Sequence, residues 1–218
     1  MKKLVIIILI IVFSCNKKDN LIIEGEIIGV KNSNIYLLIT DEGIIIDSTN
    51  IIDGKFNLKT YLDEPKEMSL ILKNKDSENK FNFISEPANI LFTSSKDKFV
   101  FNGKITNSKI YSDFKNLENQ LNSFNDRDLE MLVDQIKIST KGNLNKYDSI
   151  NDLRLKLNQK KLLFIVNYAI NNNANILSAF ISYKYRKEIR KKYLEKIYKN
   201  LSNEVRDSYY GIKLSSIL

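Results

Sequence analysis

The sequence of 218 residues contains no histidine, no tryptophan and a single cysteine, Cys15. Without histidine, the usual general base near neutral pH and the commonest metal ligand are both missing, and a Ser-His-Asp triad is excluded. One cysteine cannot form an internal disulfide or a Cys-x-x-Cys redox pair. The seven glycines are scattered and form no phosphate-binding loop. We therefore expect a non-catalytic protein with no cofactor and no bound metal.

The first residues have the organisation of a secretory leader. Lys2 and Lys3 precede the apolar run from Leu4 to Phe13, which is half the roughly 20 residues that a membrane-spanning helix needs. A basic start, a short apolar middle and a small residue before the cleavage point are typical of signal peptides. The small residue is Ser14, and Cys15 follows it. We predict that residues 1–14 are the signal peptide.

The motif "VFSC" resembles the lipobox of bacterial lipoproteins. The resemblance implies that Cys15 becomes the first residue of the mature chain and carries acyl chains, with residues 15–20 as a tether. The lipid bilayer would then be a partner, because two or more acyl chains anchor a protein stably. We expect a lipid-anchored protein of the cell envelope, periplasmic or surface facing. Asn16 is not the aspartate associated with inner-membrane retention, which favours the outer membrane. The alternative is an ordinary signal peptide with a chance cysteine.

Residues 21–106 have the two-residue hydrophobic period of β-strands. Apolar side chains alternate in short runs such as Phe56 to Leu62, and Phe99 and Phe101 continue the pattern on one face. Asp53-Gly54 is a strong hairpin signal, because a type I′ turn needs positive φ at both central residues. The pattern predicts a domain of about eight strands, as an antiparallel β-sandwich or a flattened barrel.

Residues 107–218 change to a helical period and form the predicted helical region. Ile110, Phe114, Leu117 and Leu121 fall on one stripe. A second helix is predicted with Asp148 or Ser149 as its cap. Farther on, apolar or aromatic residues recur every four positions from Ile181 to Leu201. Strands followed by four to six helices indicate the α+β fold class.

The mature chain also resembles a known bacterial module. The matching segments are Gly25 and Gly29 in the first strand, "IYL" at 35–37, "DGKFNL" at 53–58, "EPANI" at 86–90, "FNGKITNSKIYSDF" at 101–114 and "NNNANILSAFISYKY" at 171–185. They are similar to a lipoprotein module of unknown function that usually precedes a thioredoxin-like domain of the TlpA/ResA type. That domain, which holds the family's redox cysteines, is absent from these 218 residues.

This resemblance implies a binding or scaffolding module related to the front part of thiol-disulfide oxidoreductases. Its protein partner could be a thioredoxin-like domain supplied in trans. Two alternatives stay open. The chain could be a truncated or split oxidoreductase without its catalytic domain, or a lipoprotein that binds an envelope glycan or peptide. A cluster of exposed aromatic side chains on one sheet face would favour the glycan alternative.

The charge is unevenly distributed, because residues 16–106 carry 12 Lys and Arg against 14 Asp and Glu, whereas residues 107–218 carry 20 against 12. The excess is densest between Tyr183 and Asn200. A candidate basic interaction face consists of Lys184, Arg186, Lys187, Arg190, Lys191, Lys192, Lys196 and Lys199. An extracytoplasmic location argues against nucleic acid. An anionic lipid surface and an acidic protein remain candidates, and so does a simply solvated helix face.

Four acidic residues near the first turns could be taken as a metal or acid–base site: Asp41, Glu42, Asp47 and Asp53. Their spacing does not match a calcium-binding loop. Asp41 and Asp53 also fall in predicted turns, where aspartate is common for conformational reasons. We therefore predict no metal at these positions.

Overall fold

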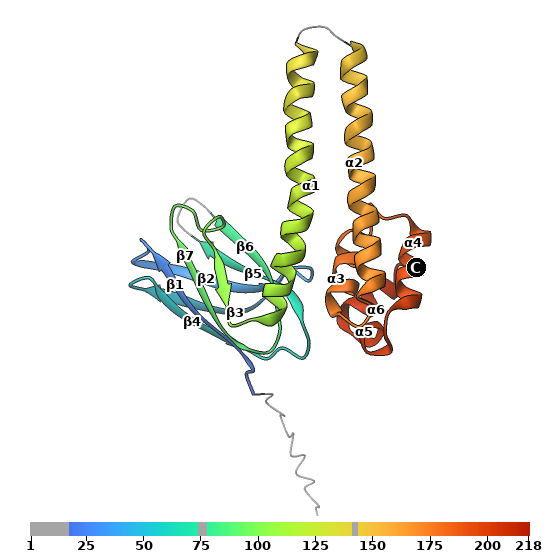
Figure 1. Ribbon diagram of the computed structural model, residues 1–218. Coiled ribbons are helices and arrows are strands. Elements are labelled where there is room, and N and C mark those ends of the chain that lie inside the picture. The colour runs from blue at the N-terminus through green and yellow to red at the C-terminus, as the bar shows by residue number, and fades with distance from the viewer. Residues whose placement is uncertain (1–17, 74–77, 141–143) are drawn as a thin grey trace, which may run out of the picture.

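The computed structural model describes residues 18–73, 78–140 and 144–218. Eight strands come first and six helices follow in the described residues, which confirms the α+β fold class (Figure 1). The strands are β1 Leu21–Ile28, β2 Asn32–Ile39, β3 Ile44–Ile52, β4 Lys55–Thr60, β5 Lys66–Lys73, β6 Glu78–Ser85, β7 Asn89–Ser95 and β8 Lys104–Thr106. The helices are α1 Lys109–Ser139, α2 Leu144–Asn171, α3 Ile176–Lys184, α4 Lys191–Asn200, α5 Asn203–Asp207 and α6 Tyr209–Ser215.

The strands form one curled sheet in the order β6-β5-β2-β3-β4-β1-β7-β8. This half-barrel is closer to the predicted flattened barrel than to two facing sheets. The sheet is mixed, because β1 and β7 pair in parallel whereas every other ladder is antiparallel. The β3–β4 hairpin turns at Asp53 (φ 50°) and Gly54 (φ 81°), as the type I′ prediction requires.

The two-residue period places one face of the sheet in a hydrophobic core. Leu58, Leu70 and Phe92 are fully buried, and the rings of Phe81 and Phe99 lie 5.2 and 5.6 Å from that of Phe92. The prediction is wrong at Phe101, which is 87% exposed. The chain turns between β7 and β8, where the Asn102 N–H donates to the Lys98 carbonyl, so the strand period ends before Phe101.

The start of α1 joins the sheet to the helical region. Ser108 caps this helix by accepting a hydrogen bond from the Tyr111 N–H, and one Glu86 oxygen accepts from the N–H groups of Lys109 and Ile110. The Tyr111 side chain packs in the sheet core. Ile110 packs in a second core, built mainly by the helices. One helical turn therefore contributes to both cores.

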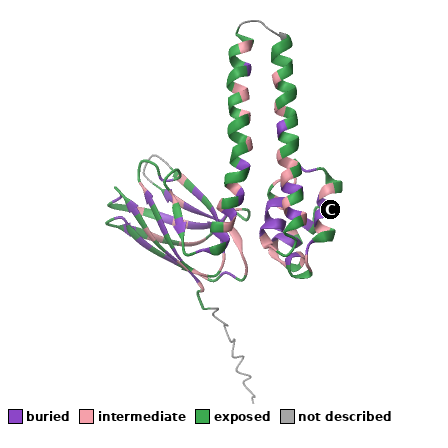
Figure 2. Cartoon of the chain, viewed as in Figure 1, coloured by how far each residue is buried: buried purple, intermediate pink, exposed green. Residues whose placement is uncertain are grey.

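Helices α1 and α2 form a hairpin that projects from the rest of the molecule (Figure 1). We call the sheet, the base of this hairpin and helices α3–α6 the body. Figure 2 shows buried residues gathered at the base of the hairpin and mainly exposed residues towards its end. We call residues 122–140 and 144–160 the arm. The predicted cap at Asp148 or Ser149 is wrong, because α2 begins at Leu144 and the Ser149 hydroxyl donates to the Asn145 carbonyl inside the helix.

The four-residue repeat from Ile181 to Leu201 does not form a continuous helix. α3 ends at Lys184 and α4 begins at Lys191, with turns between them. Ile181, Ile189 and Ile197 are nevertheless buried, so the repeat marks the helical core correctly. None of the helices in the described ranges has the length and hydrophobicity required to span a membrane.

A single glycine allows α5 and α6 to pack closely. A Cβ atom added at Gly211 in α6 would lie 2.1 Å from the Val205 carbonyl oxygen and 2.4 Å from that of Arg206. These are backbone atoms that cannot rotate away. We predict that Gly211→Ala lowers the unfolding free energy by more than about 1 kcal/mol, although alanine inside an exposed helix normally adds about that amount. Thermal unfolding followed by circular dichroism measures the change.

Ser215→Ala in the exposed last turn of α6 is the matched control and should change stability by less than about 0.5 kcal/mol. A Gly211→Ala protein as stable as the wild type would contradict the packing argument.

Candidate interaction surfaces

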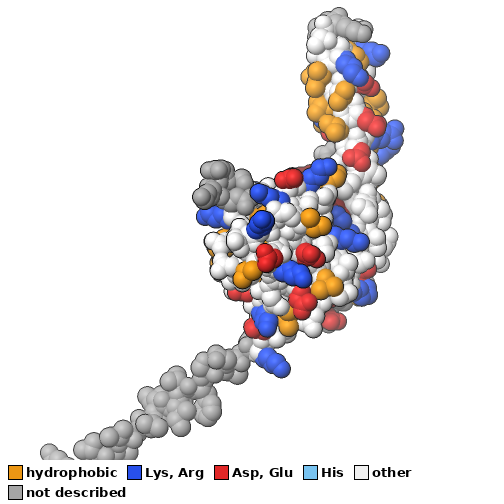
Figure 3. All heavy atoms as spheres, turned by 90° about the vertical axis from the view of Figure 1, so that its left-hand side faces the viewer, with side chains coloured by type: hydrophobic (Ala, Val, Ile, Leu, Met, Phe, Trp, Pro, Cys, Tyr) orange, Lys and Arg blue, Asp and Glu red, His pale blue; other side chains and the backbone are white. Residues whose placement is uncertain are grey.

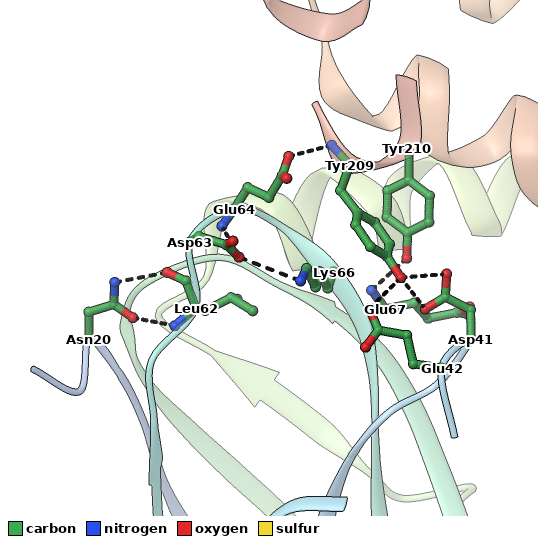
Figure 4. A network of polar contacts seen from close by, with 10 residues as sticks. All are labelled: Asn20, Asp41, Glu42, Leu62, Asp63, Glu64, Lys66, Glu67, Tyr209 and Tyr210. Atoms are coloured by element: carbon green, nitrogen blue, oxygen red, sulfur yellow. Dashed lines mark hydrogen bonds and ion pairs between the residues drawn. The ribbon is translucent and has the colours of Figure 1, made fainter. Parts of the chain in front are cut away.

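A group of polar contacts attaches helix α6 to the sheet, and we call this group the joint. The Tyr209 hydroxyl lies 2.7 Å from a Glu42 oxygen and 3.0 Å from an Asp41 oxygen, both in the β2–β3 turn (Figure 4). The Lys213 ammonium forms an ion pair with Asp41 and lies 4.5 Å from the centre of the Tyr209 ring. A C-terminal helix is thereby held against a turn that lies far from it in the sequence.

Neighbouring side chains extend this joint along β5. The Glu67 N–H donates to the Tyr210 hydroxyl oxygen over 2.8 Å, and the Glu67 carboxylate pairs with Lys184 at the end of α3. The Glu64 carboxylate accepts from the Tyr209 N–H (Figure 4). The buried Tyr210 ring also stacks edge-on against Phe180, with 4.9 Å between centroids. The joint therefore combines ion pairs with aromatic packing.

The hydroxyl groups of Tyr209 and Tyr210 form hydrogen bonds that hold the helices against the sheet. Burial, and then hydrogen bonds to Glu42 and Asp41, raise the pKa of Tyr209 far above its ordinary value. Burial likewise raises the pKa of Tyr210. Both hydroxyls therefore stay protonated at neutral pH. The joint is suited to clamping the helices onto the sheet.

The four acidic residues considered above do not form one site. Asp41 and Glu42 meet at the Tyr209 hydroxyl. Asp47 accepts instead from the N–H groups of Ser48 and Lys59, and Asp53 lies in the β3–β4 turn. In the described part of the chain, no group of three or more His, Cys, Asp or Glu side chains is placed to hold a metal ion.

The structure divides the predicted basic face. Lys184 is used in the joint, and the Arg186 guanidinium lies 4.0 Å from the Tyr183 ring centre and donates to the Tyr183 carbonyl. The other six side chains are exposed on the turns after α3 and on α4: Lys187, Arg190, Lys191, Lys192, Lys196 and Lys199. Among the described residues none of these six has an ion-pair partner. Cys15, the predicted lipidation site, lies outside the described residues.

The arm has polar contacts between its helices and apolar side chains on its outside. Arg154 forms two hydrogen bonds with Asp128, of 2.8 and 3.0 Å, and a third with the Gln135 side chain. Gln135 is only 3% exposed. In contrast, Leu129, Val133 and Ile136 on α1 are 59, 42 and 55% exposed. We call these three residues the outer stripe.

The other helix of the arm also has apolar side chains on its outside. We call this arrangement, with polar contacts inside and apolar side chains outside, the inverted distribution. Leu153 and Leu155 are about half exposed, and Leu157 is the only buried residue that α2 contributes to the described arm. Hydrophobic side chains gather along the projecting end in Figure 3. A groove of about 280 Å³ runs beside the Asp128–Arg154 pair, between Asn125 and Leu155. The apolar residues of a two-helix arm usually lie between its helices, so this distribution leaves an exposed apolar surface on the arm.

Most of these residues were missed by the sequence analysis. The joint connects Asp41 to Tyr209 across 168 positions, and no local pattern signals such a contact. The outer stripe does have a signal, since residues 129, 133 and 136 are spaced four and three apart on a helix.

The raised tyrosine pKa values predict how stability depends on pH. A group whose pKa is raised by folding contributes stability that is complete below its unfolded pKa, about 10 for tyrosine, and is lost as the pH rises through the folded value. The unfolding free energy should therefore fall above about pH 10. Tyr209→Phe should make this fall shallower, and it should also cost about 1 kcal/mol at neutral pH by leaving Asp41 and Glu42 without their shared donor. Urea unfolding between about pH 8 and pH 11 tests both effects.

The control is Tyr198→Phe, because Tyr198 is a half-buried tyrosine on α4 that takes no part in the joint. If Tyr209→Phe and Tyr198→Phe had the same alkaline profile, the joint would not contribute as described.

Residues 21–114 match the model of a protein family described as Domain of unknown function (DUF4369). The matched segment covers the whole described sheet and the first turns of α1. The match supports the presence of a domain of unknown function over these residues. No curated protein and no solved structure matches the chain.

Proposed function

We propose that this protein is a membrane-anchored extracytoplasmic lipoprotein that works as a non-catalytic scaffold and binds another protein through its arm. The single observation that carries the binding role is the inverted distribution on the arm, with Gln135 buried and the outer stripe exposed. The anchoring role is supported by the leader and by the "VFSC" motif that ends at Cys15.

The two roles are compatible in space. The described chain enters the sheet on the side away from the arm (Figure 1). β1 begins at Leu21, only six residues after Cys15. A lipid at Cys15 would hold the body near the bilayer, at most about 20 Å away for an extended tether, and the arm would reach away from the membrane. A surface so placed is accessible to another protein.

The energetics favour a protein partner for the arm. Covering a leucine, valine or isoleucine that is about half exposed gains on the order of 1 kcal/mol per side chain. The outer stripe and the exposed leucines of α2 supply several such side chains, and charged residues around them would form a polar rim. The resemblance suggests a thioredoxin-like domain as one such partner.

The glycan alternative receives less support from the sheet. In its described part, the exposed large aromatics are Tyr61 and Phe101, and both lie outside the strands. No strand face of the described sheet therefore presents the aromatic platform on which a sugar ring would stack.

Anchoring predicts that Cys15→Ser removes the protein from the membrane fraction. The substitution leaves every described residue unchanged but removes the thiol that would carry the acyl chains. Ultracentrifugation of cell lysates, followed by intact-mass measurement of the membrane-bound protein, provides the test. A Cys15→Ser protein that stays with the membrane after a carbonate wash, together with a wild-type mass lacking acyl chains, would refute lipid anchoring.

A binding role predicts that the outer stripe is covered in the native envelope. The thiol of an acylated Cys15 cannot react with maleimide, so a Val133→Cys substitution would introduce the only free thiol. We expect this thiol to react at least about tenfold more slowly in intact envelopes than in dilute purified protein, because a bound partner excludes the reagent.

Asp97→Cys, at an exposed site in the β7–β8 turn, is the control and should react at similar rates in both samples. Equal reactivity of Val133→Cys in envelopes and in dilute protein would mean that nothing covers the arm, and the binding role would be abandoned.

A further inference from the structure

We propose that the partner of the arm is a second copy of this chain, and that two arms pair antiparallel through their outer stripes. This inference rests on the proposed binding role and adds the identity and orientation of the partner. Three observations support it: the spacing of the apolar residues, the charges beside them, and the position of the stripe near the end of α1.

The outer stripe has the spacing of a short coiled-coil seam. Leu129, Val133 and Ile136 are separated by four and then three residues, which corresponds to positions d, a and d of a heptad. These positions form a continuous ridge on one side of α1, and all three side chains are 42–59% exposed. A helix that presents such a ridge to solvent can pack it against an equivalent ridge.

When two copies of α1 run in opposite directions, the charges beside the stripe of one copy meet opposite charges of the other. Glu130 and Lys137 both occupy e positions and both are exposed. Antiparallel packing of Val133 against Ile136 of the second copy brings Glu130 of each copy next to Lys137 of the other. Lys137 at present lies 3.6 Å from Asp134, in a pair that is more than 60% exposed and so stabilises little.

Parallel pairing is less favourable for the same stripe. Asp126 occupies the a position that precedes Leu129, so two parallel helices would place the two Asp126 carboxylates against each other. In the antiparallel arrangement, each Asp126 lies beyond the end of the other copy's α1, which stops at Ser139. The sequence of the arm therefore selects one orientation.

Other occupants fit the stripe less well. An anionic lipid surface gains little from this stretch, because Asp126, Glu130 and Asp134 outnumber Arg127 and Lys137 on the same helix. An unrelated protein would need its own complementary charges, whereas a second copy supplies them through symmetry. The contact spans only residues 129–140, about 18 Å of helix, so we expect a weak dimer.

The test measures the mass of the full chain in a nonionic detergent by light scattering over a concentration series. As the concentration rises, the wild type should shift from the mass of one chain to twice that mass. Glu130→Lys and Lys137→Glu should each weaken the dimer about tenfold, because two attractive contacts become repulsive. The double variant Glu130→Lys/Lys137→Glu should restore wild-type association, and an equimolar mixture of the two single variants should form heterodimers.

Lys156→Glu, which makes the same charge change on α2, should leave association unchanged because Lys156 lines a different groove of the arm. The inference would be overturned by a monomeric wild type, or by single variants that associate as the wild type does. It would also be overturned by a double variant that fails to recover while remaining folded by circular dichroism. If the purified chain is monomeric but the thiol at position 133 is still protected in envelopes, self-pairing fails and the proposed binding role stands.

Discussion

The structure depends on the first turn of α1, because that turn belongs to two hydrophobic cores at once. Tyr111 packs among the strands, whereas Ile110 and Phe114 pack with the helices. Ser108 and the Glu86 carboxylate satisfy the N–H groups that this helix start leaves unpaired. A buried helix start without such partners would be costly, so these two side chains make the shared position possible. The direction of α1, and with it that of the arm, follows from this junction.

The joint around Tyr209 provides a second attachment about 100 residues later. α1 leaves the sheet beside β6 and β8, and α6 returns to the β2–β3 turn and to β5. Two attachments at separate strands constrain the orientation of the helical region far more than one would, because rotation about either point breaks the other. The body is therefore a fixed base from which the arm extends.

Local patterns predicted much of this architecture. The period of two and the Asp53-Gly54 turn identified the strands, and the stripe from Ile110 to Leu121 identified the base of α1. Patterns failed where the outcome depends on distant partners. The parallel pairing of β1 with β7 and the contact between Asp41 and Tyr209 have no local signal. The break between α3 and α4 also lacks one, because residues 185–190 contain neither proline nor glycine.

The body and the arm differ in how far their side chains are satisfied within the chain. Every buried polar side-chain atom in the described chain has a hydrogen-bond partner, and the apolar residues of the body fill two cores. The joint could resemble an active site because it gathers carboxylates around a tyrosine. Its tyrosines are held protonated, however, and its lysines are already paired, so its chemistry is satisfied within the chain. The arm is different, because the exposed ridge of Leu129, Val133 and Ile136 is left uncovered by the described chain. A hydrophobic ridge on a fixed support gains packing energy only when another surface covers it, so the arm is the part of the described chain whose apolar surface the fold itself does not satisfy.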